Sequence, residues 1–315
     1  MFVSTLSTLN SPVKKGCIIK TFAIIFFVGC GFFVTPSAKA EVFKNCSQPF
    51  YAFKAPKITQ INKLEKTVPL CFDGFAVLYS GKTRTPLWSA EHLTRERLYR
   101  ADELEREDNF HEESRLPFAI RATVYDYSGT GYDRGHLAPN ADMASKTEQY
   151  DSFSLANIAP QSPYLNRKIW RKIESSTRYL TKVHGQAYVV TGVVFEDKNA
   201  YQWGQAVLIP SHFFKAVYFP KLNQAGVYYA PNDESGRIEV ISLDELITKH
   251  GISPIPALQP KVMAKAMPLP LPSQKLTTTQ SNGQKKDQPE FNTGEWWMQL
   301  FEQFWHWISE QLYQK

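Results

Sequence analysis

The stretch Gly131–Met143, GYDRGHLAPNADM, gathers charged and imidazole side chains within one short segment. A histidine can be neutral near pH 7 and accept a proton from water, so His136 is a candidate general base. Arginine matches the charge and geometry of a phosphodiester, which makes Arg134 a candidate phosphate contact. The alternative is an ordinary solvated loop with a structural histidine. The charged and imidazole residues of the stretch are Asp133, Arg134, His136 and Asp142.

A second group of polar residues lies in the segment 152–174, SFSLANIAPQSPYLNRKIWRKIE. Apolar residues recur at helical spacing over 165–185, and this pattern predicts a helix that ends at Gly185. In an α-helix, Glu174 would be rotated by about 80° from Asn166 and displaced by ~12 Å along the axis. The two side chains can then flank one cleft without binding an ion side by side, which Mg²⁺ tolerates because it keeps several waters. The alternative role for Asn166 is a helix cap.

Strand-like and helix-like patterns alternate between residues 75 and 230. Runs rich in Val, Ile, Tyr and Phe, with turn residues between them, predict strands. Residues 242–251 predict a second, short helix, with Ser242 as N-cap, Glu245 at the capping-box position and Gly251 as C-cap. This order of elements predicts an α+β domain with an antiparallel sheet. The expected strands are residues 75–80, 187–195, 206–219 and 226–230.

Several blocks of sequence, in a consistent order and spacing, carry a family resemblance. They are TPLWSAEHLTRERL (85–98), LEREDNF (104–110), YDYSGTGYDRGHLAPNADM (125–143), ANIAPQ (156–161), LNRKIW (165–170) and IE (173–174). Together they resemble the DNA/RNA non-specific endonucleases, the ββα-metal nucleases that include secreted bacterial nucleases and mitochondrial endonuclease G. The resemblance covers roughly residues 72–258. It implies an α+β fold of the ββα-metal endonuclease type, with a central antiparallel sheet flanked by helices.

The resemblance also implies roles for three residues around a metal ion. His136 takes the place of the general base that deprotonates the attacking water. Asn166 takes the place of the single direct protein ligand of Mg²⁺, for which Mn²⁺ can substitute. Glu174 takes the place of the residue that holds a metal-bound water.

Four further residues match supporting positions of the family. Arg106 and Arg134 match arginines that stabilise charge on the phosphate. Asp133 is expected to support the geometry of the motif, and Asn157 to help orient the site. Three nearby arginines are alternative candidates for the role assigned to Arg106; they are Arg95, Arg97 and Arg100.

These residues predict an exported, Mg²⁺-dependent hydrolase, a sugar-non-specific endonuclease that cuts phosphodiester bonds in DNA, RNA or both. Contacts confined to phosphate and sugar carry no sequence information, which fits a non-specific nuclease. The alternative function is a catalytically inactive nucleic-acid-binding or surface adaptor protein with the same fold. The sequence leaves the preference between DNA and RNA open.

The first forty residues have the pattern of a secretory signal peptide. Three lysines precede an apolar run at 22–34, and Ser37-Ala38-Lys39-Ala40 supplies a cleavage site, so the mature chain is expected to begin near Glu41 and to be secreted or periplasmic. Alternatives are an uncleaved anchor and a lipoprotein at Cys30. The segment holds four lysines and no acid, so removing it reduces the formal charge from +6 to +2, and net charge says little about partners.

Two cysteines, Cys46 and Cys71, remain beyond the signal segment. In an exported chain they are expected to form one structural disulfide. Two cysteines alone cannot build a four-ligand zinc site of the usual kind.

Composition divides the rest of the chain into three parts. The endonuclease domain is expected to span residues 41–258, followed by a flexible linker rich in Pro, Gln, Ser and Lys at 259–292. Residues 293–315 carry an apolar, Trp-rich stripe at helical spacing and predict an amphipathic helix. This helix is expected to dock on the domain or self-associate, or alternatively to contact a membrane surface.

Overall fold

The computed structural model describes residues 43, 46–59, 66–196 and 207–272. The signal segment, most of the predicted linker and the Trp-rich helix at 293–315 lie outside the described residues. Within the described ranges, no helix is both long enough and apolar enough to span a bilayer.

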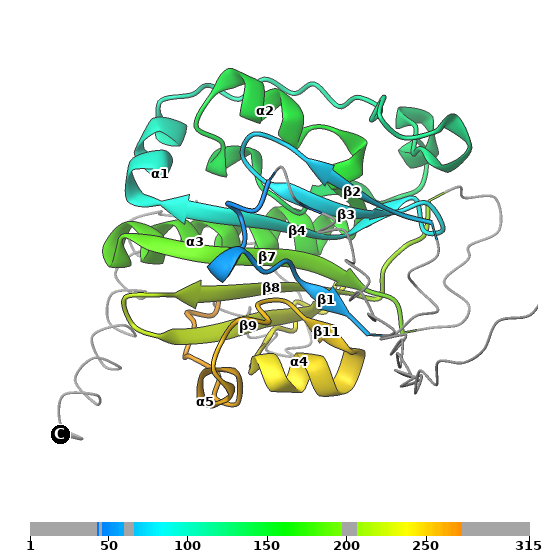
Figure 1. The fold of residues 1–315 in the computed structure, drawn as a ribbon. Helices are drawn as coiled ribbons and strands as arrows, with labels where there is room; N and C mark the ends of the chain where they lie inside the picture. Colours follow the sequence, from blue (N-terminus) through cyan, green and yellow to red (C-terminus); the bar gives the residue numbers. More distant parts are fainter. Residues whose placement is uncertain (1–42, 44–45, 60–65, 197–206, 273–315) are drawn as a thin grey trace, which may run out of the picture. The chain divides into compact units, whose positions relative to one another are not determined.

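The centre of the fold is a seven-stranded sheet in which every neighbouring pair is antiparallel (Figure 1). The predicted α+β class with a central antiparallel sheet is therefore confirmed. The strand expected over 206–219 begins only at His212, because Pro210 has no backbone N–H to donate to a sheet ladder. In sheet order the strands are β10 (Glu239–Ile241), β9 (Gln224–Pro231), β8 (His212–Phe219), β7 (Gln186–Val194), β4 (Thr85–Thr94), β3 (Ala76–Ser80) and β2 (Thr67–Cys71).

The two faces of the sheet differ in what covers them. On one face, α3 (Arg171–His184) and the turn before it pack through Trp170 against Phe213, with ring centroids 5.7 Å apart. On the other face, Phe43 packs against Trp88 at 5.3 Å, and α4 (Leu243–His250) lies beside β9 (Figure 1). Both faces are thus buried, which explains why the central strands are apolar on both sides.

The remaining regular elements are short and lie around the central sheet. The predicted caps of α4 are present: Ser242 and Glu245 form a capping box, and Gly251 ends the helix in the left-handed region at φ 65°. These elements include α1 (Arg95–Asp102), α2 (Lys146–Ser152), α5 (Pro260–Met263), and the paired strands β1 (Lys57–Ile58) and β11 (Ile252–Ser253).

The helix predicted over 165–185 is not a single α-helix. Its first turn, Leu165–Trp170, is a π-helix (η7), and α3 begins at Arg171. The Arg171 N–H donates to the Asn166 carbonyl, five residues earlier rather than four. The rotation expected between Asn166 and Glu174 assumed α-helical geometry throughout, so that expectation is wrong.

The described part of the predicted linker, residues 259–272, packs on the sheet rather than leaving it. Met267 and Leu269 are buried, and the Met267 N–H donates to the Ala225 carbonyl of β9 at 2.7 Å. The hydroxyl of Tyr228 donates to the Pro270 carbonyl at 3.0 Å. Pro260 occupies the start of the short helix α5, where proline is tolerated, and the later prolines do not prevent the extended segment after it from burying its apolar side chains.

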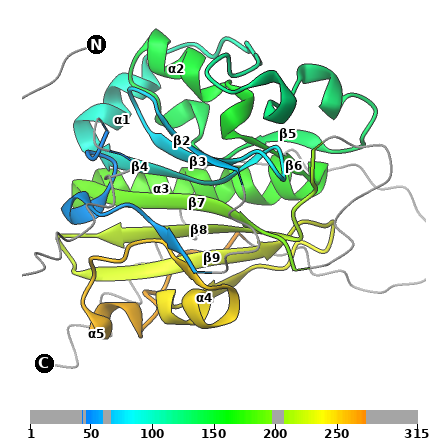
Figure 2. The same ribbon diagram turned by 45° about the vertical axis from the view of Figure 1, so that its right-hand side comes forward.

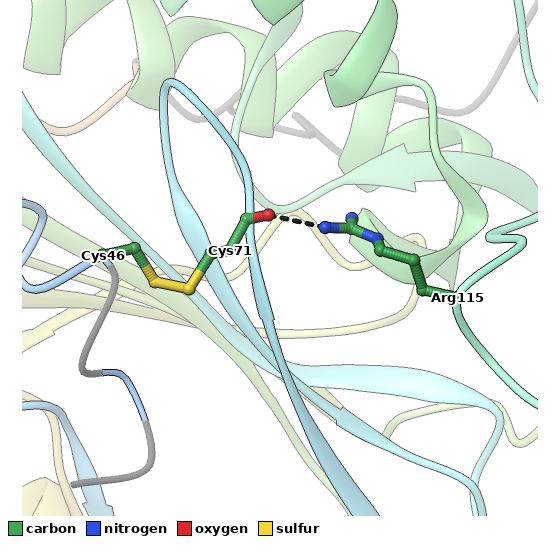
Figure 3. Close-up of a disulfide and its surroundings, with 3 residues drawn as sticks. All are labelled: Cys46, Cys71 and Arg115. Carbon is green, nitrogen blue, oxygen red and sulfur yellow. Dashed lines mark hydrogen bonds between the residues drawn. A yellow bond between two sulfur atoms is a disulfide. The ribbon is translucent and has the colours of Figure 1, made fainter.

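The predicted disulfide joins Cys46 to Cys71, with their Cα atoms 5.7 Å apart (Figure 3). It ties the segment before the sheet to β2, which is the edge strand. Arg115 donates to the Cys71 carbonyl at 2.7 Å (Figure 3). Its guanidinium lies 4.3 Å from the Phe72 ring centroid. The bond closes a loop of 25 residues and so restricts the unfolded chain.

Candidate active site

The motif that carries His136 forms one strand of a small two-stranded sheet (Figure 2). β5 (Asp133–His136) pairs antiparallel with β6 (Ile158–Gln161), and η7 and α3 follow soon after β6. The two strands approach closely at Gly135, where a Cβ atom would lie 2.3 Å from Oε1 of Gln161. Glycine is required at this position because any larger residue would collide with β6.

His136 is held against two phenylalanine rings. Its ring centroid lies 5.4 Å from that of Phe110 and 4.9 Å from that of Phe153. Burial, and then the charge of Arg106, lower the pKa of His136 to about 3, so the imidazole is neutral at physiological pH. Its Nε2 atom is buried and has no hydrogen-bond partner among the described residues. When the proton is on Nδ1, Nε2 is therefore a neutral nitrogen with a free lone pair.

Two arginines flank this aromatic pair. The Arg134 guanidinium lies 4.3 Å from the Phe110 ring centroid, and the Arg106 guanidinium lies 5.3 Å from that of Phe153. Arg106 is 56% exposed and pairs with Asp108 at 2.5 Å. Its charge acts on His136 and also on Glu174, which places this arginine near both groups.

Two of the three other candidate arginines, Arg95 and Arg97, are used elsewhere. Arg95 donates to the backbone carbonyls of Lys182 and Val183, and Arg97 pairs with Glu148 at 2.7 Å. Arg106 is thus the upstream arginine that the structure brings to the histidine.

Asp133 connects the two-stranded sheet of β5 and β6 to the helical turn that carries the expected metal ligand. It accepts a hydrogen bond from Nδ2 of Asn166 at 2.9 Å and two from the Arg167 guanidinium, at 2.8 and 2.5 Å. Burial alone would raise the pKa of Asp133, but these hydrogen bonds outweigh it and lower the pKa. Asp133 therefore fixes the orientation of the Asn166 amide group through the amide nitrogen. The amide oxygen of Asn166 takes no part in this contact.

Asn157 is fully buried and satisfies all its hydrogen-bonding groups within the protein. Its Oδ1 accepts from the Ser89 hydroxyl at 2.7 Å and from the Ala138 N–H at 3.0 Å. Its Nδ2 donates to the carbonyls of Ala138 and Ser152, both at 2.9 Å. The side chain joins β4 to the segment after β5, so it supports the site without being free to contact a substrate.

Glu174, on α3, lies in a cluster of buried charges beneath the helix. Burial raises the pKa of Glu174 to about 7, against the opposing charges of Lys215 and Arg178. Register places Lys215 on the same sheet face as Thr191, to which its ammonium donates a hydrogen bond. The acids of the cluster are Glu91, Asp142 and Glu174, and its bases are Arg97, Arg178 and Lys215.

Sequence reasoning missed several members of this arrangement. Glu91 is fully buried on β4, and neither carboxylate oxygen has a hydrogen-bond partner among the described residues. Arg178 pairs with the buried Asp142 at 2.9 Å. An acid inside an otherwise apolar strand is a detectable signal, since charged residues are rarely buried without a reason. Arg167, Phe110 and Phe153 carried no comparable signal.

Glu174→Gln is expected to stabilise the fold at pH 8 but not at pH 4.5. The unfolded carboxyl ionises near pH 4.5 and the folded one near pH 7, so its contribution to stability is complete below pH 4.5 and is lost as the pH rises through 7. At 1.36 kcal/mol per unit of pKa, the gain for the glutamine variant is at most about 3 kcal/mol.

Urea denaturation in EDTA at both pH values measures this difference. Glu234→Gln, at an exposed acid, is the matched control and should behave as wild type at both pH values. Equal stability of Glu174→Gln and wild type at pH 8 would show that Glu174 ionises without cost in the fold.

The ligand atoms available around Asn166 suit a cation that binds few protein groups. No group of three or more His, Cys, Asp or Glu residues that could hold a metal occurs in the described part of the chain. An ion bound here would therefore rely on the Asn166 amide oxygen and on water, with Glu174 available to bind such a water. Mg²⁺ fits this set because it keeps several waters and prefers oxygen ligands.

Two paired strands followed by a helix, with a histidine on the first strand and an asparagine at the start of the helix, define the ββα-metal class of nucleases. A model of the DNA/RNA non-specific endonuclease family matches residues 57–259. The chain belongs to this family, as its sequence motifs predicted, and the family consists of hydrolases that generally depend on a divalent metal.

Similar proteins include nucleases from animals and fungi. Mitochondrial endonuclease G of Bos taurus is 34% identical over 219 residues, which are 61% of this chain and 69% of that protein. The Homo sapiens protein is 38% identical over 156 residues, 46% of this chain and about half, 52%, of its own length. Nuclease C1 of Cunninghamella echinulata var. echinulata is 32% identical over 175 residues, 51% of this chain and 69% of that protein.

A solved structure supports the same fold. The crystal structure of the EndoG/EndoGI complex contains a chain that superimposes with a TM-score of 0.53 at 24% identity. The match covers 58% of this chain and 84% of that chain.

Proposed function

We propose that the protein is an exported, Mg²⁺-dependent endonuclease that hydrolyses phosphodiester bonds in DNA, RNA or both without reading sequence. The observation that carries this proposal is the neutral His136 ring, whose buried Nε2 lacks a partner while Arg106 lies close by. A neutral imidazole beside a fixed positive charge can accept a proton next to a phosphate, whose own negative charge would raise the low pKa of the ring when it binds.

Each residue of the site then has a chemical task. His136 accepts the proton of the attacking water, a contribution of about 10²–10⁴-fold in such reactions. Arg106 and Arg134 neutralise the charge that accumulates on the phosphate oxygens. Asn166 would hold the metal ion through its amide oxygen, and Glu174 would accept a hydrogen bond from a metal-bound water. When bound, Mg²⁺ adds charge neutralisation and lowers the pKa of its waters.

Export is proposed from two features that agree. The charged, apolar and small-residue pattern of residues 1–40 is typical of a secretory signal. The disulfide between Cys46 and Cys71 belongs to an oxidising compartment, since such bonds are rare in the cytosol. The mature enzyme would then begin near Glu41 and act outside the cytosol.

The decisive experiment is digestion of plasmid DNA and of RNA by residues 41–315 across a Mg²⁺ titration. We expect cleavage in Mg²⁺ and none in EDTA. Asn166→Ala should raise the half-saturating Mg²⁺ concentration by at least about 10–100-fold, the range seen when weaker metal contacts are lost. The same Mg²⁺ requirement in Asn166→Ala and wild type would remove Asn166 as the ligand.

A matched control separates this effect from general loss of polar groups. Asp102→Asn removes an exposed carboxylate that pairs with Lys182 on the surface, and it should titrate as wild type. Nucleic-acid binding without cleavage at any Mg²⁺ concentration would instead favour the inactive adaptor.

A further inference from the structure

A group of cations follows the expected metal ligand along η7 and the start of α3. Lys168 and Arg171 are exposed, whereas Ile169 and Trp170 between them are buried against the sheet. The apolar side of this turn therefore anchors the helix, and the basic side faces solvent. The cations of the segment are Arg167, Lys168, Arg171 and Lys172.

The π-helical turn decides which residue neighbours Asn166. Because the Arg171 N–H bonds to the Asn166 carbonyl, Arg171 lies one turn beyond Asn166 on the same side of the helix. In an α-helix that place would belong to Trp170, four residues on, which is buried here. The additional residue in the turn thus keeps the tryptophan in the core and sets a cation beside the asparagine.

Lys168 and Arg171 differ from Arg167 in whether an acid pairs with them. The Arg167 guanidinium is paired with Asp133, while no described acid lies within ion-pair distance of Lys168 or Arg171. The pKa of the neighbouring Lys172 is lowered by burial and then by the charges of Arg171 and Lys168, so the three cations lie close together. Clustered like charges repel one another, and a polyanion relieves that repulsion.

We propose that Lys168 and Arg171 bind the sugar-phosphate backbone of the substrate strand next to the scissile phosphate. The inference rests on the proposed nuclease function and adds the surface that holds the flanking strand. Both residues are exposed side chains on the helical turns that carry the expected metal ligand, Arg171 on the side of Asn166 and Lys168 further round the helix, and both carry charge of the sign that phosphates attract. Contacts of this kind strengthen binding equally for all sequences.

Salt dependence of binding tests the proposal directly. Fluorescence anisotropy with a labelled 20-base-pair duplex, in EDTA between 50 and 200 mM NaCl, gives the slope of log K against log salt. Each phosphate contact on duplex DNA contributes about 0.9 to that slope. Lys168→Gln and Arg171→Gln should each reduce its magnitude by about 0.9, and the double variant by about 1.8.

Lys146→Gln is the matched control, because this lysine is 82% exposed and pairs with Glu107 at 3.5 Å. It should retain the wild-type slope. If the double variant also retains that slope, Lys168 and Arg171 do not contact phosphate and the proposal fails.

Cleavage assays separate this proposal from the function on which it rests. In Mg²⁺, the two variants should raise KM several-fold and leave kcat near its wild-type value. A wild-type protein that binds duplex with the expected slopes but never cleaves it would overturn the nuclease assignment and leave the binding surface intact. Cleavage with unchanged KM in both variants would overturn the surface and leave the nuclease.

Discussion

His136→Ala is expected to reduce plasmid cleavage in Mg²⁺ by about 10²–10⁴-fold, the usual contribution of a general base. The buried Nε2 of the wild-type ring has no partner in the described structure, so the variant loses a proton acceptor and no protein hydrogen bond at that atom. Alanine also leaves a space beside Phe110 and Phe153, which should lower stability without preventing folding.

The measurement is initial cleavage rate at saturating Mg²⁺, together with circular dichroism and thermal unfolding of the same samples. His92→Ala is the control, because this ring lies on the opposite face of the sheet, stacked on Tyr188 at 4.2 Å. It should lose some stability and keep its activity. A folded His136→Ala protein with wild-type activity would show that another group activates the water.

Asn157→Ala is expected to cost much of the folding free energy. The substitution leaves two carbonyls, one N–H and one hydroxyl without their present partner in a dry interior. Each such group costs about 1–3 kcal/mol when left unsatisfied. The sum approaches the 5–15 kcal/mol that holds a typical domain together, so the variant should be largely unfolded at 37 °C.

Urea denaturation, or recovery of soluble protein where the variant is too unstable, measures the loss. Ser89→Ala is the graded control, because it removes only one of the four hydrogen bonds and should cost about 1 kcal/mol. A stable but inactive Asn157→Ala protein would contradict the structural role and indicate direct participation in the reaction.

Periodicity predicted the parts of the fold whose burial is regular. β7, β9 and α4 lie close to their predicted ranges, since each has a continuous apolar run or clear helix caps. β4 was not predicted as a strand from its pattern, because Ser89 and Glu91 place polar groups on a buried face. Ser89 bonds to Asn157 and Glu91 lies among the buried charges beneath α3, and a pattern that scores hydrophobicity cannot anticipate either contact.

The candidate site was predictable where short motifs carry its chemistry. His136, Asp133 and Asn166 were selected from sequence, and the structure links the last two through a hydrogen bond. The hydrogen bond between Ser89 and Asn157 joins residues that are 68 positions apart in the sequence. The supporting role of Asn157 therefore depends on tertiary structure. The π-helical turn likewise has no sequence signature among those considered, although it determines the neighbour of Asn166. The catalytic roles themselves stay predictions.

The disulfide has a consequence for the cell that makes the protein. The Cys71 carbonyl accepts from Arg115, Arg115 pairs with the buried Glu113, and Glu113 accepts from Ser154, three residues before Asn157. In the reducing cytosol the Cys46–Cys71 disulfide would not form, so the Cys71 end of this series of contacts would lack its covalent link to Cys46. Under the export proposed above, the disulfide would form only outside the cytosol, so the contacts behind the site would be completed after the chain has left the genome and transcripts of its producer.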